Sequence, residues 1–181
     1  MRRHVGQLHQ AGLVRIEKAK GRVGHPTHMC VLTDMGNELF PKGYDRFSVE
    51  LIQSVVLLNG DSKLEQLLET RKSQLLKKYA GRMAGKSRPA RVREVTRILN
   101  EEGYMAESSP LNSGVFRITE HNCPLIRIAR QYPRVCQPEL CLLGQLLGAE
   151  VKRETHMLNG DSKCSYLVQF PASRKAAAPG C

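Results

Sequence analysis

The stretch CPLIRIARQYPRVCQPELCLLGQLLG, residues 123–148, decides how the C-terminal half of this chain folds. Its apolar residues recur at helical spacing on both sides of Tyr132-Pro133, which predicts one helix over 123–132 and another over 138–148. The proline between them favours a break in the chain direction. Two amphipathic helices need a second layer to pack against, and we expect the flanking segments to supply it.

Those flanking segments predict strands. The segments on the C-terminal side surround an Asn159-Gly160 pair, which is typical of a hairpin turn. The expected strands are 105–109, 115–120, 150–158 and 163–170, and a helix over 90–102 precedes them. The sequence therefore predicts a compact C-terminal α+β domain over residues 86–170, followed by a flexible tail, 171–181.

The N-terminal region predicts a different unit. A short helix begins at the N-terminus and ends near Gly12, and two short strands, 14–19 and 28–33, follow on either side of a basic Gly/Pro-containing loop. Helix, strand, loop and strand are the second half of a winged helix, so we expect a partial winged helix-turn-helix over residues 1–40. Residues 41–85 carry a helical stripe of leucines and are expected to form a helical linker and dimerisation region.

The charge of the chain favours a polyanionic partner. The formal net charge is +11 and the pI is about 9.7, which points to nucleic acid, although composition alone leaves a basic membrane-surface protein open. The sequence has no apolar run of the length that spans a bilayer and no secretory signal at its N-terminus, so we expect a cytoplasmic protein.

Basic and polar residues of the N-terminal unit are the candidate DNA contacts. Residues in the first turns of a recognition helix face base edges, whereas those of a wing meet phosphates. The alternative is a solvated basic face on an ordinary helix and hairpin. The helix contributes Arg2, Arg3, His4 and Gln7, and the wing contributes Lys18, Lys20, Arg22 and His25.

The cysteines are concentrated in the C-terminal domain. Four of the six lie between residues 123 and 164, where a reducing compartment would keep them as thiols or metal ligands. Cys123 precedes a proline, Cys136 follows after twelve intervening residues, and Cys164 begins the last strand. No CxxC pair is present, which argues against a zinc ribbon or a ferredoxin-type loop. Spacing alone leaves both buried free thiols and a shared metal site open.

Four segments carry a family resemblance: RRHVGQLHQAGLV (2–14), GRVGHPTHMCVLT (21–33), TEHNCPLIRIARQYPRVC (119–136) and RETHMLNGDSKCSYLV (153–168). Together they resemble the SufR-type regulators of iron–sulfur cluster assembly. The resemblance implies a homodimer whose C-terminal domain holds a [4Fe–4S] cluster, with the ligands Cys123, Cys136 and Cys164. The fourth family cysteine falls at Glu150 here, so the fourth ligand is open among Glu150, Cys141 and His121.

These observations predict a DNA-binding transcriptional repressor of iron–sulfur assembly genes that senses iron or redox status through its cluster. The expected partners are operator DNA and a second copy of the chain, with no membrane and no small-molecule substrate. No catalytic motif is present, so we do not expect an enzyme. The helices that normally precede a recognition helix are missing, so we also expect the reading frame to extend upstream of Met1. The alternatives are a zinc- or thiol-based redox-sensing regulator, and a metal-binding protein or enzyme that has lost DNA binding.

Overall fold

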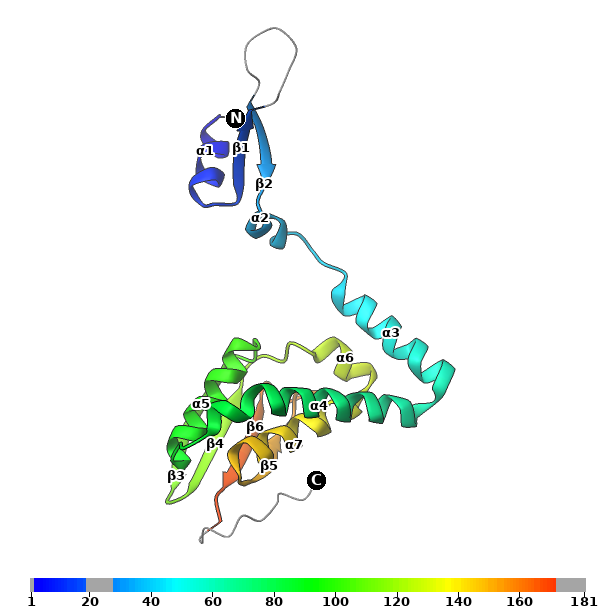
Figure 1. Ribbon diagram of the computed structural model, residues 1–181, viewed down its shortest axis with the longest axis vertical. Helices are drawn as coiled ribbons and strands as arrows, with labels where there is room; N and C mark the ends of the chain where they lie inside the picture. The colour runs from blue at the N-terminus through cyan, green and yellow to red at the C-terminus, as the bar shows by residue number, and fades with distance from the viewer. Residues whose placement is uncertain (1, 19–27, 172–181) are drawn as a thin grey trace. The chain divides into compact units, whose positions relative to one another are not determined.

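The computed structural model describes residues 2–18 and 28–171, which fall into two compact units, Met1–Tyr44 and Asp45–Cys181. Over these residues the chain is α+β, as the sequence predicts, and it has seven α-helices and two antiparallel sheets (Figure 1). Among the described residues, no helix has both the length and the apolar character to cross a membrane.

The first unit is a small helix and hairpin. Its elements are α1 (Arg2–Gln10), β1 (Val14–Lys18), β2 (His28–Leu32) and α2 (Asp34–Glu38). Gly12 has a positive φ of 70°, which ends α1 and turns the chain into β1. Thr33 joins the pieces, because its hydroxyl donates to the Gly12 carbonyl at 2.6 Å and also accepts from the amide of Gly36 to cap α2.

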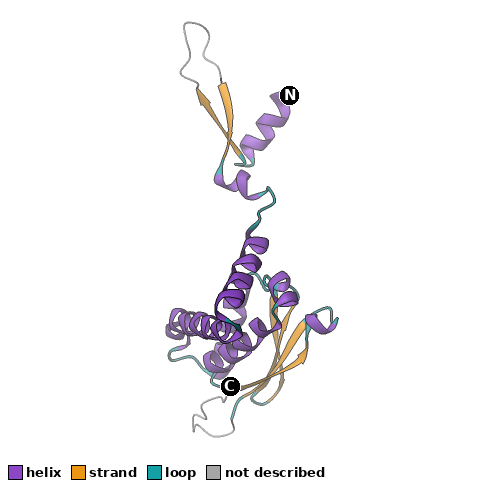
Figure 2. Ribbon diagram, turned by 90° about the vertical axis from the view of Figure 1, so that its right-hand side faces the viewer, coloured by secondary structure: helices purple, strands orange, loops and turns teal. Residues whose placement is uncertain are grey.

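The second unit packs helices on one face of a four-stranded sheet (Figures 1 and 2). Its α-helices are α3 (Tyr44–Asn59), α4 (Asp61–Met83), α5 (Arg88–Glu101), α6 (Ile126–Gln131) and α7 (Cys136–Leu147). Its strands are β3 (Ala106–Asn112), β4 (Val115–Glu120), β5 (Glu150–Thr155) and β6 (Cys164–Gln169). Two short 3-10 helices, η1 (Pro133–Val135) and η2 (Met157–Asn159), precede α7 and follow β5. The predicted hairpin is confirmed as β5 and β6.

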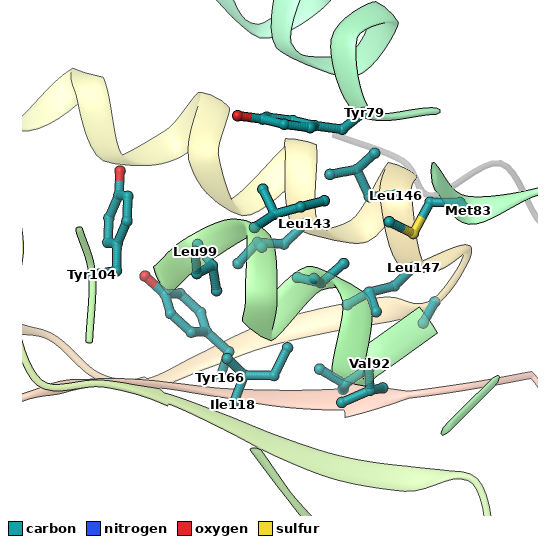
Figure 3. Close-up of a cluster of buried hydrophobic side chains, with 14 of the residues drawn as sticks. Tyr79, Met83, Val92, Leu99, Tyr104, Ile118, Leu143, Leu146, Leu147 and Tyr166 are labelled. Atoms are coloured by element: carbon teal, nitrogen blue, oxygen red, sulfur yellow. The ribbon is translucent and has the colours of Figure 1, made fainter. Parts of the chain in front are cut away.

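The strand order is β3-β4-β6-β5, and all neighbours are antiparallel. Because side chains alternate along a strand, the pairing of Ile118 with Tyr166 points both toward the helices. They pack there against Val92 of α5 and Leu147 of α7 (Figure 3). The core of the second unit is therefore the layer between the sheet and these helices.

The structure places α4 differently from the sequence prediction. Tyr79 and Met83 of α4 are buried in the same core as Leu143 and Leu146 of α7 (Figure 3). The boundary predicted near residue 85, between a helical linker and the C-terminal domain, thus falls inside one compact unit. Most of the predicted tail, residues 172–181, lies outside the described residues.

We expect Leu147→Ala to lower the free energy of unfolding by about 2–5 kcal/mol, because this side chain is completely buried between α5 and the sheet. Leu57→Ala is the matched control. Leu57 is 76% exposed on α3, so the change should stay within about 0.5 kcal/mol. Urea denaturation followed by circular dichroism measures both, and equal effects would contradict the core described above.

Candidate functional site

Three cysteines from separate parts of the second unit line one pocket. Cys123 lies in the loop after β4, Cys136 is the first residue of α7, and Cys164 is the first residue of β6. Cys136 and Cys164 are buried and Cys123 is half-buried. The structure therefore brings together the three cysteines that the sequence analysis named.

The sheet register explains why two of these cysteines meet. Glu120, the last residue of β4, pairs with Cys164, the first residue of β6. In an antiparallel pair the end of one strand lies beside the start of the next, so the loop that carries Cys123 begins next to Cys164. The amide of Met157 donates to the Cys164 sulfur at 3.4 Å, which orients that side chain.

Cys136 is held from two sides. It packs with Ala129 of α6 and Val135 of η1 in a small apolar cluster of its own. Across the pocket, the guanidinium Nη2 of Arg153 in β5 donates to the Cys136 carbonyl at 2.8 Å. The start of α7 is thus tied to the sheet at the level of the pocket.

The pocket keeps the thiols protonated when nothing positive is bound. Burial raises the pKa of Cys123 to about 12 and that of Cys136 to about 11, and it also raises the pKa of Cys164. Each of these thiols also lies close enough to another of the three that the negative charge of one raises the pKa of the other. A cation bound between them would reverse this preference and favour the thiolates.

Two buried carboxyl groups line the same pocket. Tyr166 donates to Glu120 at 3.1 Å, and Tyr104 donates to Glu139. Burial, together with the neighbouring carboxyl of Glu139, raises the pKa of Glu120 to about 8. Burial also raises the pKa of Glu139. Glu120 is therefore mostly protonated at neutral pH.

The same two carboxyls also line a second, mainly apolar cavity, which contains leucines of α4, α5 and α7. Figure 3 shows Tyr104 and Tyr166, the donors to these carboxyls, close to that part of the core. The polar pair therefore separates the cysteine pocket from the apolar interior.

The three candidates for a fourth ligand lie elsewhere. The Nε2 atom of His121 is hydrogen-bonded to Oε1 of Glu107 at 3.0 Å on the exposed surface. Glu150 forms an ion pair with Lys152 at 3.1 Å. Cys141 is buried in α7 and does not line the pocket. His156 does line it, and burial lowers the pKa of this imidazole, so it is neutral and able to act as a ligand.

Sequence reasoning missed Glu120, Glu139, Arg153 and His156 as members of this site. One signal for Glu139 was available, since it follows Cys136 by three residues and residues at that spacing share a helix face. The other three depend on strand register and turn geometry. Across the described residues, no three His, Cys, Asp or Glu side chains are grouped tightly enough to hold a single metal ion.

The predicted DNA-contacting residues are only partly described. Arg2, Arg3, His4 and Gln7 lie in α1, and Lys18 ends β1; of these, Arg3, His4 and Gln7 have exposed side chains. Lys20, Arg22 and His25 lie outside the described residues. Cys30 is exposed on β2 of the first unit and is not among the residues that line the cysteine pocket.

Comparisons with known proteins do not identify a family for this chain. No family model matches the chain, and no curated protein sequence matches it. A solved structure that does match is a trafficking protein particle complex subunit 3 from Naegleria fowleri, covalently bound to palmitic acid. It is 12% identical, the match covers 72% of this chain and 97% of that chain, and the TM-score is 0.40.

These findings contradict the resemblance to SufR-type regulators. No family model matches the chain and no curated sequence matches it, so no finding supports membership of that family. The predictions of a transcriptional repressor and of operator DNA and a homodimer as partners were therefore wrong. Positive charge on a helix and hairpin does not specify DNA, because many folds carry a basic surface for other reasons.

The raised pKa of Glu120 predicts that stability falls as pH rises. Between about pH 4.5 and 8 the folded protein keeps a proton on Glu120 that the unfolded chain has lost, so the free energy of unfolding decreases by about 1 kcal/mol per pH unit. Glu120→Gln keeps an acceptor for Tyr166 and should flatten this dependence. Urea denaturation at several pH values measures it, and an unchanged slope in the variant would refute the assignment to Glu120.

Proposed function

We propose that the second unit binds an iron–sulfur cluster, with Cys123, Cys136 and Cys164 as its ligands. The observation that carries the proposal is the convergence of these three cysteines, from a loop, a helix start and a strand start, on one pocket. Iron–sulfur clusters are held by cysteine thiolates that come from several parts of a chain. When bound, such a cluster supplies reversible electron transfer.

The surroundings fit an anionic, thiolate-held group. The Nε atom of Arg153 is buried and has no hydrogen-bond partner among the described residues, and this side chain lines the cysteine pocket. A buried N–H without an acceptor is unfavourable, and a thiolate or sulfide sulfur would supply one. The low solvent exposure of Cys136 and Cys164 also protects a cluster from water and oxidants.

The fourth coordination position belongs to a residue of the pocket wall. His156 offers a neutral imidazole and Glu139 a carboxyl group, and both line the pocket with the cysteines. Neither His121, Glu150 nor Cys141 lines it. Zinc at the same thiolates is the competing occupant, but a structural zinc site needs four protein ligands, whereas a cluster contributes sulfide ligands of its own.

The proposal concerns binding and electron storage, not catalysis, and a reducing compartment such as the cytoplasm suits three unpaired thiols. For the first unit we propose only a fold, the second half of a winged helix, supported by the order α1, β1, β2. We attach no DNA-binding role to it.

Reconstitution without oxygen, using ferrous iron and sulfide, tests the proposal on the full chain. The wild-type protein should take up iron and sulfide and show the broad visible absorption of a cluster. Cys123→Ser, Cys136→Ser and Cys164→Ser should each weaken retention by more than about ten-fold, because each removes a ligand.

Cys30→Ser is the control, because Cys30 is a free thiol that is exposed on β2 of the first unit. It should retain the wild-type iron content. Uptake of zinc with no iron and sulfide by the wild-type protein would replace the cluster with a zinc site. Full iron content in the three serine variants of the pocket would refute the ligand assignment.

A further inference from the structure

We propose that Arg153 is a positioning residue for the bound cluster: its Nε–H donates a hydrogen bond to a sulfur of the cluster or its thiolates, and its charge stabilises the reduced state. This inference rests on the proposed function. It concerns how the pocket sets the redox behaviour of the cluster, which the ligand assignment alone does not address.

The side chain of Arg153 is held on the pocket side of the sheet. Arg153 of β5 pairs with Tyr166 of β6, and because paired residues share a face, it projects toward the helices, as Tyr166 does. Its guanidinium lies 5.6 Å from the centre of the Tyr166 ring, and Nη2 donates to the Cys136 carbonyl at 2.8 Å. Two contacts therefore fix the plane of the guanidinium and leave Nε available.

The unpartnered Nε–H of Arg153 belongs to a side chain that lines the pocket of the three cysteines. Nε is buried and unpartnered within the described chain, while the same side chain lines the pocket with Cys123, Cys136 and Cys164. The rigid fork of a guanidinium presents its remaining N–H in a set direction, which a flexible lysine amine does not. Hydrogen bonds to cluster sulfurs are one of the main protein controls on reduction potential.

The charge of Arg153 also lies at the pocket. The side chain of Arg153 lines the cavity together with Cys123, Cys136 and Cys164. An anionic cluster with its thiolates would be attracted to this cation. Since one-electron reduction adds negative charge, a nearby cation favours the reduced state.

A purely structural Arg153 would only hold the Cys136 carbonyl, so the experiment needs a readout beyond folding. The full chain is reconstituted with iron and sulfide, and the midpoint potential is measured by optical redox titration for wild type, Arg153→Gln and Arg153→Lys. Arg117→Gln is the matched control, because Arg117 lies in β4 and pairs with Glu154 at the surface.

We expect Arg153→Gln to lower the midpoint potential by at least about 59 mV. For a one-electron couple this shift is a ten-fold decrease in the ratio of reduced to oxidised protein at a given potential. Arg153→Lys should recover part of this shift, and Arg117→Gln should match the wild type. If Arg153→Gln loses its cluster while Arg153→Lys retains it, the requirement for charge is supported directly.

Two results would overturn the inference alone: a loaded Arg153→Gln variant with the wild-type potential, or loss of both cluster and folded circular dichroism signal in the Gln and Lys variants alike. The second result would show a structural role only. Failure of the wild-type protein to take up iron and sulfide would overturn the proposed function as well. The iron and sulfide content of the wild-type protein is therefore measured before any variant is compared.

Discussion

The antiparallel register between β4 and β6 is the constraint on which both the core and the cysteine pocket depend. It pairs Ile118 with Tyr166 in the core and Glu120 with Cys164 at the end of the ladder. Because side chains alternate along a strand, a slip of one residue would turn Ile118 and Tyr166 away from the helices. The same slip would also move Cys164 away from the neighbouring loop, which carries Cys123. One set of backbone hydrogen bonds therefore fixes two features of the second unit.

The packing of α7 against the sheet positions Cys136, the third cysteine of the pocket. Leu143 and Leu147 hold α7 against the sheet layer, and this packing sets where the helix starts, at Cys136. The apolar part of α7 therefore positions a polar end, where Glu139 and the carbonyl of Cys136 meet Tyr104 and Arg153. Buried polar groups of this kind lower stability unless each one is satisfied, and most are paired within the unit. The unpaired Nε of Arg153 is an exception.

Much of the second unit could be predicted from sequence, because its helices and strands have clear periodicity and an Asn-Gly turn. The position of α4 could not, since a stripe of leucines shows that a helix face is buried but not what covers it. The three cysteines were named through a family resemblance that the comparisons then contradicted, so their convergence in space is the firmer argument. Arg153 and Glu120 escaped notice because only strand register brings residues so distant in sequence into one pocket.

Free buried cysteines are common in protein cores and need no ligand to explain them. Such cysteines behave as small apolar side chains, and a pocket that served only to bury them would be lined by apolar neighbours. This pocket instead holds a guanidinium with an unused N–H, two carboxyl groups and an imidazole around the three thiols. Arginine is rarely buried without an anion, and the buried Nε of Arg153 has no acceptor among the described residues. Thiolate or sulfide sulfurs of a bound cluster would supply that acceptor, which adds to the convergence of the three cysteines as a reason to regard them as ligands.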